Sequence, residues 1–101
     1  MSTLKVRVDQ KKLDRAAYVL KCVAHPVRIS IIDLLDQRER LTVSQLQEVL
    51  QVEQSLLSHH LTNMRDKGIV YTQREGKNVY YFLTDNTITD IIGCINGCKL
   101  F

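Results

Sequence analysis

Hydrophobic positions recur at helical spacing through the first half of the chain. Between Gln10 and Val23 the apolar positions fall three, four and seven residues after the first, which predicts an amphipathic helix. Pro26 suits the first turn of a second helix, Pro26–Gln37, which is apolar on nearly every side. We expect that helix at the centre of the core. A shorter third helix is expected after Thr42 or Ser44, either of which suits a capping position.

The stretch Glu53–Gly68 predicts a fourth helix whose two sides differ in character. Leu57, Leu61 and Met64 form one apolar stripe, and Gly68 follows a last turn that carries cations. Amides, hydroxyls and imidazoles match the donors and acceptors on base edges in the DNA major groove, and a helix N-terminus suits phosphate. By itself the pattern also fits an ordinary surface helix with a polar face. The hydrogen-bonding side chains at the start of this helix are Gln54, Ser55, Ser58 and His59.

Two runs rich in Val, Tyr, Phe and Thr follow and predict a β-hairpin. They are Ile69–Arg74 and Asn78–Leu83, and the connection between them contains Gly76. Two helices joined by about three residues and followed directly by a hairpin have the layout of a winged helix-turn-helix. Arg74 and Lys77 at the hairpin tip are then placed to reach phosphates or a minor groove. A plain hairpin with solvated charges is the alternative.

The two terminal helices complete the predicted architecture. Asp85 is expected to cap the last helix, whose isoleucines recur on one face. The first and last helices carry more apolar side chains than a three-helix core with one hairpin covers, so we expect a homodimer through them. A two-fold dimer would present two recognition helices to an inverted repeat. The predicted fold class is mainly α with a β-hairpin wing: an arm over residues 1–9 precedes one five-helix domain over residues 10–101.

Composition narrows the function classes. The 101 residues suffice for one core, and a 45% hydrophobic and 25% charged content is typical of a folded domain. The net charge of +3 is compatible with nucleic-acid binding without demanding it. No apolar run approaches the ~20 residues that span a bilayer, and the N-terminus lacks a secretory pattern, so a cytoplasmic protein without a membrane partner is expected. A nucleophile–base–acid set and a glycine-rich phosphate loop are both missing, so an enzyme is not expected.

Three segments in succession carry a family resemblance. LKCVAHPVRISIIDLL, VEQSLLSHHLTNMRDKGIV and REGKNVYYFL resemble the ArsR/SmtB family of bacterial winged-helix repressors, over about residues 10–95. The resemblance implies a homodimer that binds operator DNA and is released when an inducer binds or oxidises sensor residues. By position it implies groove contacts through Gln54, Ser55, Ser58 and His59, and wing contacts through Arg74 and Lys77.

Four positions need separate comment. Gln51 stands where family members often have a turn glycine, and we expect it to tighten or distort the turn. Leu56 stands where a small polar residue is common, which affects its share of backbone contact. His25, before Pro26, is expected to cap or pack, and His60 is expected to be half-buried behind the fourth helix.

The resemblance leaves little support for a metal site. Family members that sense zinc on the last helix use a ligand pattern whose equivalents here are Asp85, Thr87, Cys98 and Phe101, and only Asp85 fits. The Cys-x-Cys-like segment of soft-metal sensors is replaced by Thr42-Val43-Ser44. We therefore expect no metal cofactor at either place.

The remaining sensor candidates are the thiols Cys22, Cys94 and Cys98. Cys94 and Cys98 lie one helical turn apart, with α-carbons about 6 Å apart, and Cys22 ends the helix expected to pack against theirs. A pair such as Cys22 with Cys94 or Cys98 could oxidise, or be bridged by sulfur, and shift the dimer helices. Alternatively all three thiolates could bind trivalent arsenic or antimony.

A third interpretation treats the cysteines as small core hydrophobes in a constitutive DNA-binding or protein-interaction module. We favour the redox or reactive-sulfur interpretation because it requires only two cysteines within reach of each other.

Overall fold

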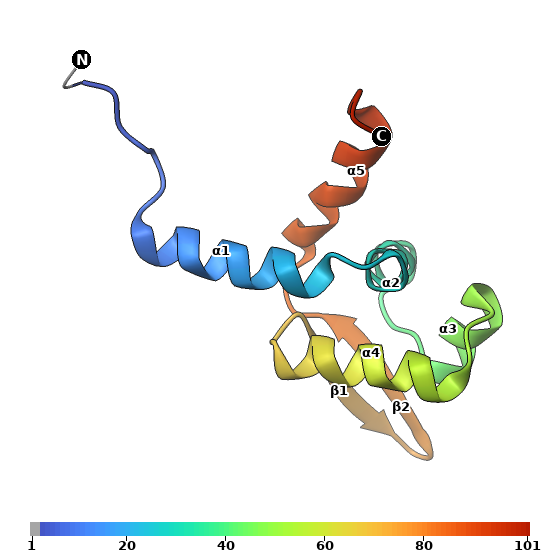
Figure 1. The fold of residues 1–101 in the computed structure, drawn as a ribbon. Helices are drawn as coiled ribbons and strands as arrows, with labels where there is room; N and C mark the ends of the chain where they lie inside the picture. The colour runs from blue at the N-terminus through green and yellow to red at the C-terminus, as the bar shows by residue number, and fades with distance from the viewer. Residues whose placement is uncertain (1–2) are drawn as a thin grey trace.

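The computed structural model describes residues 3–101, so the first two residues of the expected arm lie outside the described part. Over residues 3–101 the chain runs through five α-helices, one hairpin and one 3-10 turn (Figure 1). The division into an arm and a domain stays a prediction. The elements in order are α1 (Gln10–Val23), α2 (Pro26–Gln37), α3 (Val43–Leu50), α4 (Gln54–Asp66), β1 (Val70–Glu75), β2 (Asn78–Leu83), η1 (Asn86–Thr89) and α5 (Asp90–Gly97).

The predicted fold class is confirmed, with two adjustments near the end of the chain. The first two helices have the predicted bounds. Strand β1 begins and ends one residue later than expected, at Val70 and Glu75, so the hairpin turn consists of Gly76 and Lys77 alone. Asp85 caps the 3-10 turn η1 instead of an α-helix, because its carboxylate accepts the Thr87 amide at 2.9 Å. The α-helical part of the last helix therefore begins only at Asp90.

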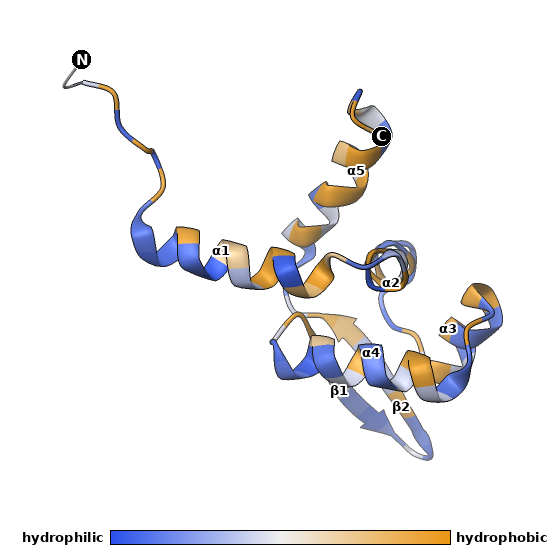
Figure 2. Ribbon diagram, in the orientation of Figure 1, coloured by the Kyte–Doolittle hydropathy of each residue, from blue (hydrophilic) through white to orange (hydrophobic). Residues whose placement is uncertain are grey.

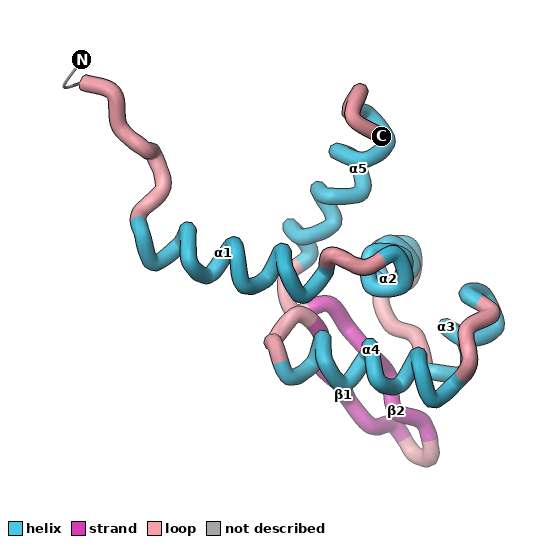
Figure 3. Tube along the Cα trace, in the orientation of Figure 1, coloured by secondary structure: helices cyan, strands magenta, loops and turns pink. Residues whose placement is uncertain are grey.

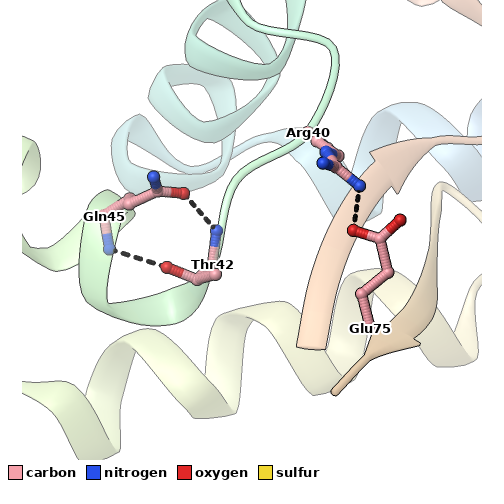
Figure 4. A network of polar contacts seen from close by, with 4 residues as sticks. All are labelled: Arg40, Thr42, Gln45 and Glu75. Carbon is pink, nitrogen blue, oxygen red and sulfur yellow. Dashed lines mark hydrogen bonds and ion pairs between the residues drawn. The ribbon is translucent and has the colours of Figure 1, made fainter. Parts of the chain in front are cut away.

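Hydrogen bonds at the helix ends explain where the helices start and stop. Thr42, not Ser44, caps α3: its hydroxyl accepts the Gln45 amide at 3.2 Å, and the Gln45 side chain accepts the Thr42 amide at 2.9 Å (Figure 4). This reciprocal pair is a capping box. At the end of α4, Gly68 has a φ of +79°, a conformation that favours glycine, and its amide bonds back to the Arg65 carbonyl.

The core lies between α2 and α4. Ile31 and Ile32 of α2 are fully buried, as is the apolar stripe of α4, which meets α2 on one side and β1 on the other. Figure 3 shows the hairpin lying behind α4. The α4 stripe consists of Leu57, Leu61 and Met64.

The hairpin is attached to the helical body at its buried base and, further along, through the α2–α3 connection. Its strands pair antiparallel, with Val70 opposite Leu83 at the base and Glu75 opposite Asn78 at the turn. Leu41, in the α2–α3 connection, forms a bridge with Tyr81 of β2 through two backbone hydrogen bonds of 3.3 and 2.8 Å. The buried base fixes the direction in which the polar tip projects (Figure 2).

Helices α1 and α5 extend away from the core (Figure 1). Only the last two residues of α1, Cys22 and Val23, are buried, while Leu20 is 53% exposed. Figure 2 shows apolar segments along α5 and the inner end of α1. No helix in residues 3–101 combines the length and apolar character needed to cross a membrane.

Candidate DNA interface and thiol positions

Burial divides α4 into an inner and an outer side. The apolar stripe and His60 face inward, as helical spacing requires. Gln54, Ser55 and His59 are exposed, and Ser58 is half-buried. The four sequence-predicted groove residues therefore lie together on the first two turns of one helix, on the side that the core leaves open.

The first turn of α4 contains an interaction that the residue pattern did not predict. Glu53 precedes the helix, and within residues 3–101 its side chain caps none of the α4 amides. Its carboxylate instead accepts the Ser55 hydroxyl at 2.6 Å. The backbone amides at this helix start thus lack a side-chain partner and are available to an anion. The hydroxyl of Ser55, by contrast, already donates its one hydrogen bond to Glu53.

The connection into α4 depends on an unusual backbone conformation. Gln51 adopts φ 55° and ψ 38°, the left-handed conformation that favours glycine. Its amide donates to the Gln47 carbonyl at 2.8 Å and its side chain donates to the Glu48 carbonyl at 2.7 Å. The turn is therefore built without glycine, at a local cost of roughly 1–2 kcal/mol.

The wing tip carries its two predicted cations exposed, Arg74 and Lys77. The nearby carboxylate of Glu75 pairs with Arg40, the one ion pair within residues 3–101 (Figure 4). The Arg40 guanidinium also lies 4.3 Å from the centre of the Tyr80 ring. Because Arg40 neutralises the acid beside the wing cations, both cations remain available to phosphate.

A polar cluster behind α4 joins three elements. Arg28 of α2 donates from Nε to His60 Nδ1 at 2.9 Å, and from Nη1 to the Cys22 carbonyl at 2.9 Å and to Asn63 Oδ1 at 3.3 Å. His60 is only 4% exposed, so the expectation that it is half-buried is wrong: the α1–α2 connection closes over it. The His25 ring centre lies 4.3 Å from that of His60.

The same contacts determine which ring nitrogen of His60 carries a proton and make the neutral ring more favourable. Nδ1 accepts a hydrogen bond from Arg28, so the proton of the neutral ring sits on Nε2, which is buried without a partner among residues 3–101. Burial lowers the pKa of His60 below its ordinary value of 6.5, and the neighbouring His25, Arg28 and His59 lower it further. A protonated His60 would lose the Arg28 hydrogen bond and face a like charge.

His25 has the capping role that was expected. Its Nδ1 accepts the Val27 amide at 3.1 Å, which begins α2. Leu56, on the first turn of α4, is 47% exposed and takes no part in the core.

The three thiols occupy different surroundings. Cys22 is 6% exposed, with Sγ 3.7 Å from Asn63 Oδ1 and 3.6 Å from Arg28 Nη1, so it touches α4. Cys94 is exposed on α5, and Cys98 is half-buried just past the end of that helix. Within the described residues of one chain, no group of three or more Cys, His, Asp or Glu side chains is placed to hold a metal ion.

An apolar groove of about 350 Å³ lies where α1, α2 and α5 meet. It receives side chains from both helices that were predicted to form the dimer surface, and one of the candidate thiols. Its lining residues are Leu20, Val23, Ala24, Ile29, Ile91, Cys94, Ile95 and Phe101.

Known proteins are similar to this chain in sequence and in architecture. The profile of the arsR family of bacterial regulatory proteins matches residues 25–72. The transcriptional repressor PagR of Bacillus anthracis is 32% identical over 90 residues, which are 89% of this chain and 90% of PagR. Its crystal structure matches with a TM-score of 0.78 at 33% identity, over 87% of this chain and 100% of that one.

The crystal structure of the transcriptional repressor BigR from Xylella fastidiosa matches with a TM-score of 0.77 at 28% identity, over 89% of this chain and 93% of that one. These relatives are transcriptional regulators, so the expectation that the chain is not an enzyme is confirmed.

Proposed function

Because this chain belongs to the ArsR family of bacterial regulatory proteins, we propose that it represses transcription as a homodimer on an inverted-repeat operator and leaves that operator in response to a thiol-based signal. Family membership makes it a DNA-binding transcriptional repressor with a winged helix. The observation that supports operator recognition is the division of α4, whose inner side is fully buried while its first two turns offer hydrogen-bonding groups outward.

In this proposal the start of α4 enters the major groove and the wing follows the backbone. Amide, hydroxyl and imidazole groups read base edges, and the two wing cations bind phosphate or a minor groove. Twofold symmetry places the two α4 helices about one DNA turn apart, roughly 34–36 Å. The proposed contacts are Gln54, Ser55, Ser58 and His59 in the groove, and Arg74 and Lys77 on the wing.

The apolar groove between α1, α2 and α5 supports the homodimer. Phe101 on its rim is 75% exposed and Leu20 is 53% exposed, and a second copy would remove both from water. Sedimentation velocity at micromolar concentration is expected to give a dimer. A monomer under those conditions would contradict this part of the proposal.

For the signal, the contact between Cys22 and α4 is the supporting observation. Two thiols such as Cys22 and Cys94 or Cys98 lose two protons and two electrons to hydrogen peroxide, which leaves as two waters, and a disulfide forms. With a persulfide donor, each thiol takes the donor's outer sulfur and the donor leaves as a thiol; the two persulfides then condense to a trisulfide with release of hydrogen sulfide. Either bridge would pull Cys22 away from Asn63, its partner on α4.

Two alternatives remain as outcomes of the test. Trivalent arsenic or antimony could bind Cys22, Cys94 and Cys98 as thiolates, and this would require thiols from both subunits because residues 3–101 of one chain do not gather them. The burial of Cys22 in a hydrogen-bonded site instead favours a structural thiol in a constitutive repressor.

One gel-shift series separates these possibilities. The chain is titrated onto the promoter of its own gene when reduced, when treated with peroxide or a persulfide donor, and with arsenite. We expect peroxide or the persulfide donor to abolish the shift in wild type but not in Cys22→Ser. Loss of binding with arsenite alone would favour the metalloid alternative, and no response to any agent would favour the constitutive one. Binding that is insensitive to salt and to DNA sequence would contradict operator recognition itself.

A further inference from the structure

Glu53, the acidic residue before α4, does not cap the helix with its side chain. Asp9 and Thr42, which precede α1 and α3, each accept an amide from the helix that follows, as cap residues do. Glu53 occupies the same position before α4, and among the described residues its carboxylate bonds only the Ser55 hydroxyl. It therefore lies exposed beside the proposed groove-reading residues and contributes no cap.

The Glu53–Ser55 pair has a one-sided hydrogen-bonding character. An ionised carboxylate only accepts hydrogen bonds. A serine hydroxyl whose one hydrogen is already donated to a carboxylate can only accept further hydrogen bonds. Their separation of 2.6 Å is that of a charge-assisted hydrogen bond. Gln54 between them still has amide donors of its own, so the acceptor-only character belongs to this pair.

Base edges in the major groove respond differently to such a pair. The amino groups at N4 of cytosine and N6 of adenine donate hydrogen bonds there, whereas O6 and N7 of guanine and O4 of thymine accept them. An acceptor-only pair can bond the first two bases and is repelled by the others. The negative charge of Glu53 also opposes the phosphates of every sequence alike.

We propose that Glu53, together with Ser55, determines operator specificity by selecting a base that carries an amino group, cytosine or adenine, at one position of each half-site. This inference rests on the proposed entry of α4 into the major groove. The selected base gains a charge-assisted hydrogen bond, while all other DNA meets only the charge repulsion. Since specificity is a difference between two affinities, the hydrogen bond raises it, whereas the repulsion lowers the affinity for all DNA equally and cancels from the difference.

The test removes the amino group of cytosine or adenine from the DNA, and separately removes the carboxylate of Glu53 from the protein. An operator is first selected from random DNA with the full chain. Each cytosine of a half-site is then replaced in turn by 2-pyrimidinone, and each adenine by purine, which lack the amino group. Dissociation constants are measured by fluorescence anisotropy for wild type and for Glu53→Ala.

At one position we expect removal of the amino group to weaken wild-type binding about tenfold or more, in line with the discrimination of a good base contact. The same removal should change Glu53→Ala binding less than twofold. Glu53→Ala should also bind non-operator DNA several-fold tighter than wild type. Glu53→Gln, which keeps an acceptor oxygen and loses the charge, should gain non-operator affinity while retaining the amino preference.

Glu39→Ala is the matched control, because it removes the same charge from an exposed residue in the α2–α3 connection. It should keep the full dependence on the amino group. If wild type selects an operator but Glu53→Ala loses as much affinity as wild type at every amino removal, the inference is wrong while recognition by α4 stands. If selection enriches no sequence, the proposed function fails, and this inference fails with it.

Discussion

Acidification should destabilise this fold through His60 in particular. His60 is buried, its Nδ1 must stay unprotonated to accept from Arg28, and its pKa is lowered by burial and by nearby histidines and Arg28. The unfolded chain therefore binds a proton at His60 more readily than the folded chain does. By linkage, the stabilising contribution is complete above the ordinary pKa of 6.5 and is lost as the pH falls below it.

The loss of unfolding free energy that the protonation of His60 can cause has an upper limit. One group contributes at most about 1.4 kcal/mol per pH unit while its folded and unfolded forms differ in protonation. Between pH 6.5 and 5.5 the free energy of unfolding should therefore fall by up to ~1.4 kcal/mol on account of His60. With a urea m-value of about 1–3 kcal/mol/M, a loss of ~1 kcal/mol lowers the unfolding midpoint by about 0.3–1 M.

The assay compares wild type with His60→Gln in urea at pH 7.5, 6.5 and 5.5. Glutamine has an oxygen that can accept from Arg28, and it does not titrate. The charged or titratable groups facing His60 are Arg28, His25 and His59, and all three are present in both proteins. Wild type should lose more stability on acidification than His60→Gln. Equal losses in the two proteins would refute the role given to His60.

Three further predictions concern the caps and the DNA contacts. Gln51→Val should lower the free energy of unfolding by about 1 kcal/mol because a branched residue tolerates a positive φ less well than glutamine, while Gln51→Gly should not lower it because glycine removes the cost of the left-handed conformation; equal losses in urea unfolding would contradict this. Thr42→Ala should cost about 1 kcal/mol in the same assay through loss of the capping box, and an unchanged midpoint would argue against it. Lys77→Ala should weaken binding to all sequences alike and reduce the salt slope by about 1, whereas His59→Ala should relax sequence preference; the reverse pattern in anisotropy titrations would overturn this assignment.

The elements could be predicted because their signals are local. The spacing of apolar residues and the position of Pro26 fixed the first two helices, and Gly68 marked the end of α4. The hairpin followed from its β-forming residues and its glycine turn. The boundary errors fell where local signals compete, as at Asp85, whose carboxylate caps a 3-10 turn as readily as an α-helix.

The contacts around the candidate site could not be predicted in the same way. Arg28 lies 32 residues from His60 and 35 from Asn63, so no spacing rule connects them, and only the packing of α2 against α4 brings them together. Cys22 was singled out for its place on a terminal helix, and its contact with α4 came from the structure. The sequence did not predict a role for Glu53, because its hydrogen bond to Ser55 depends on how the two side chains are oriented at the start of α4.

The claim that the start of α4 reads operator DNA is tested most directly by a ratio of affinities. Binding of a selected operator and of non-operator DNA is measured at one salt concentration for wild type and for a variant with alanine at Gln54, Ser55, Ser58 and His59. The operator affinity of the variant should fall to its non-operator affinity, while the non-operator affinity should stay near that of wild type. A variant that keeps the wild-type ratio would contradict this claim.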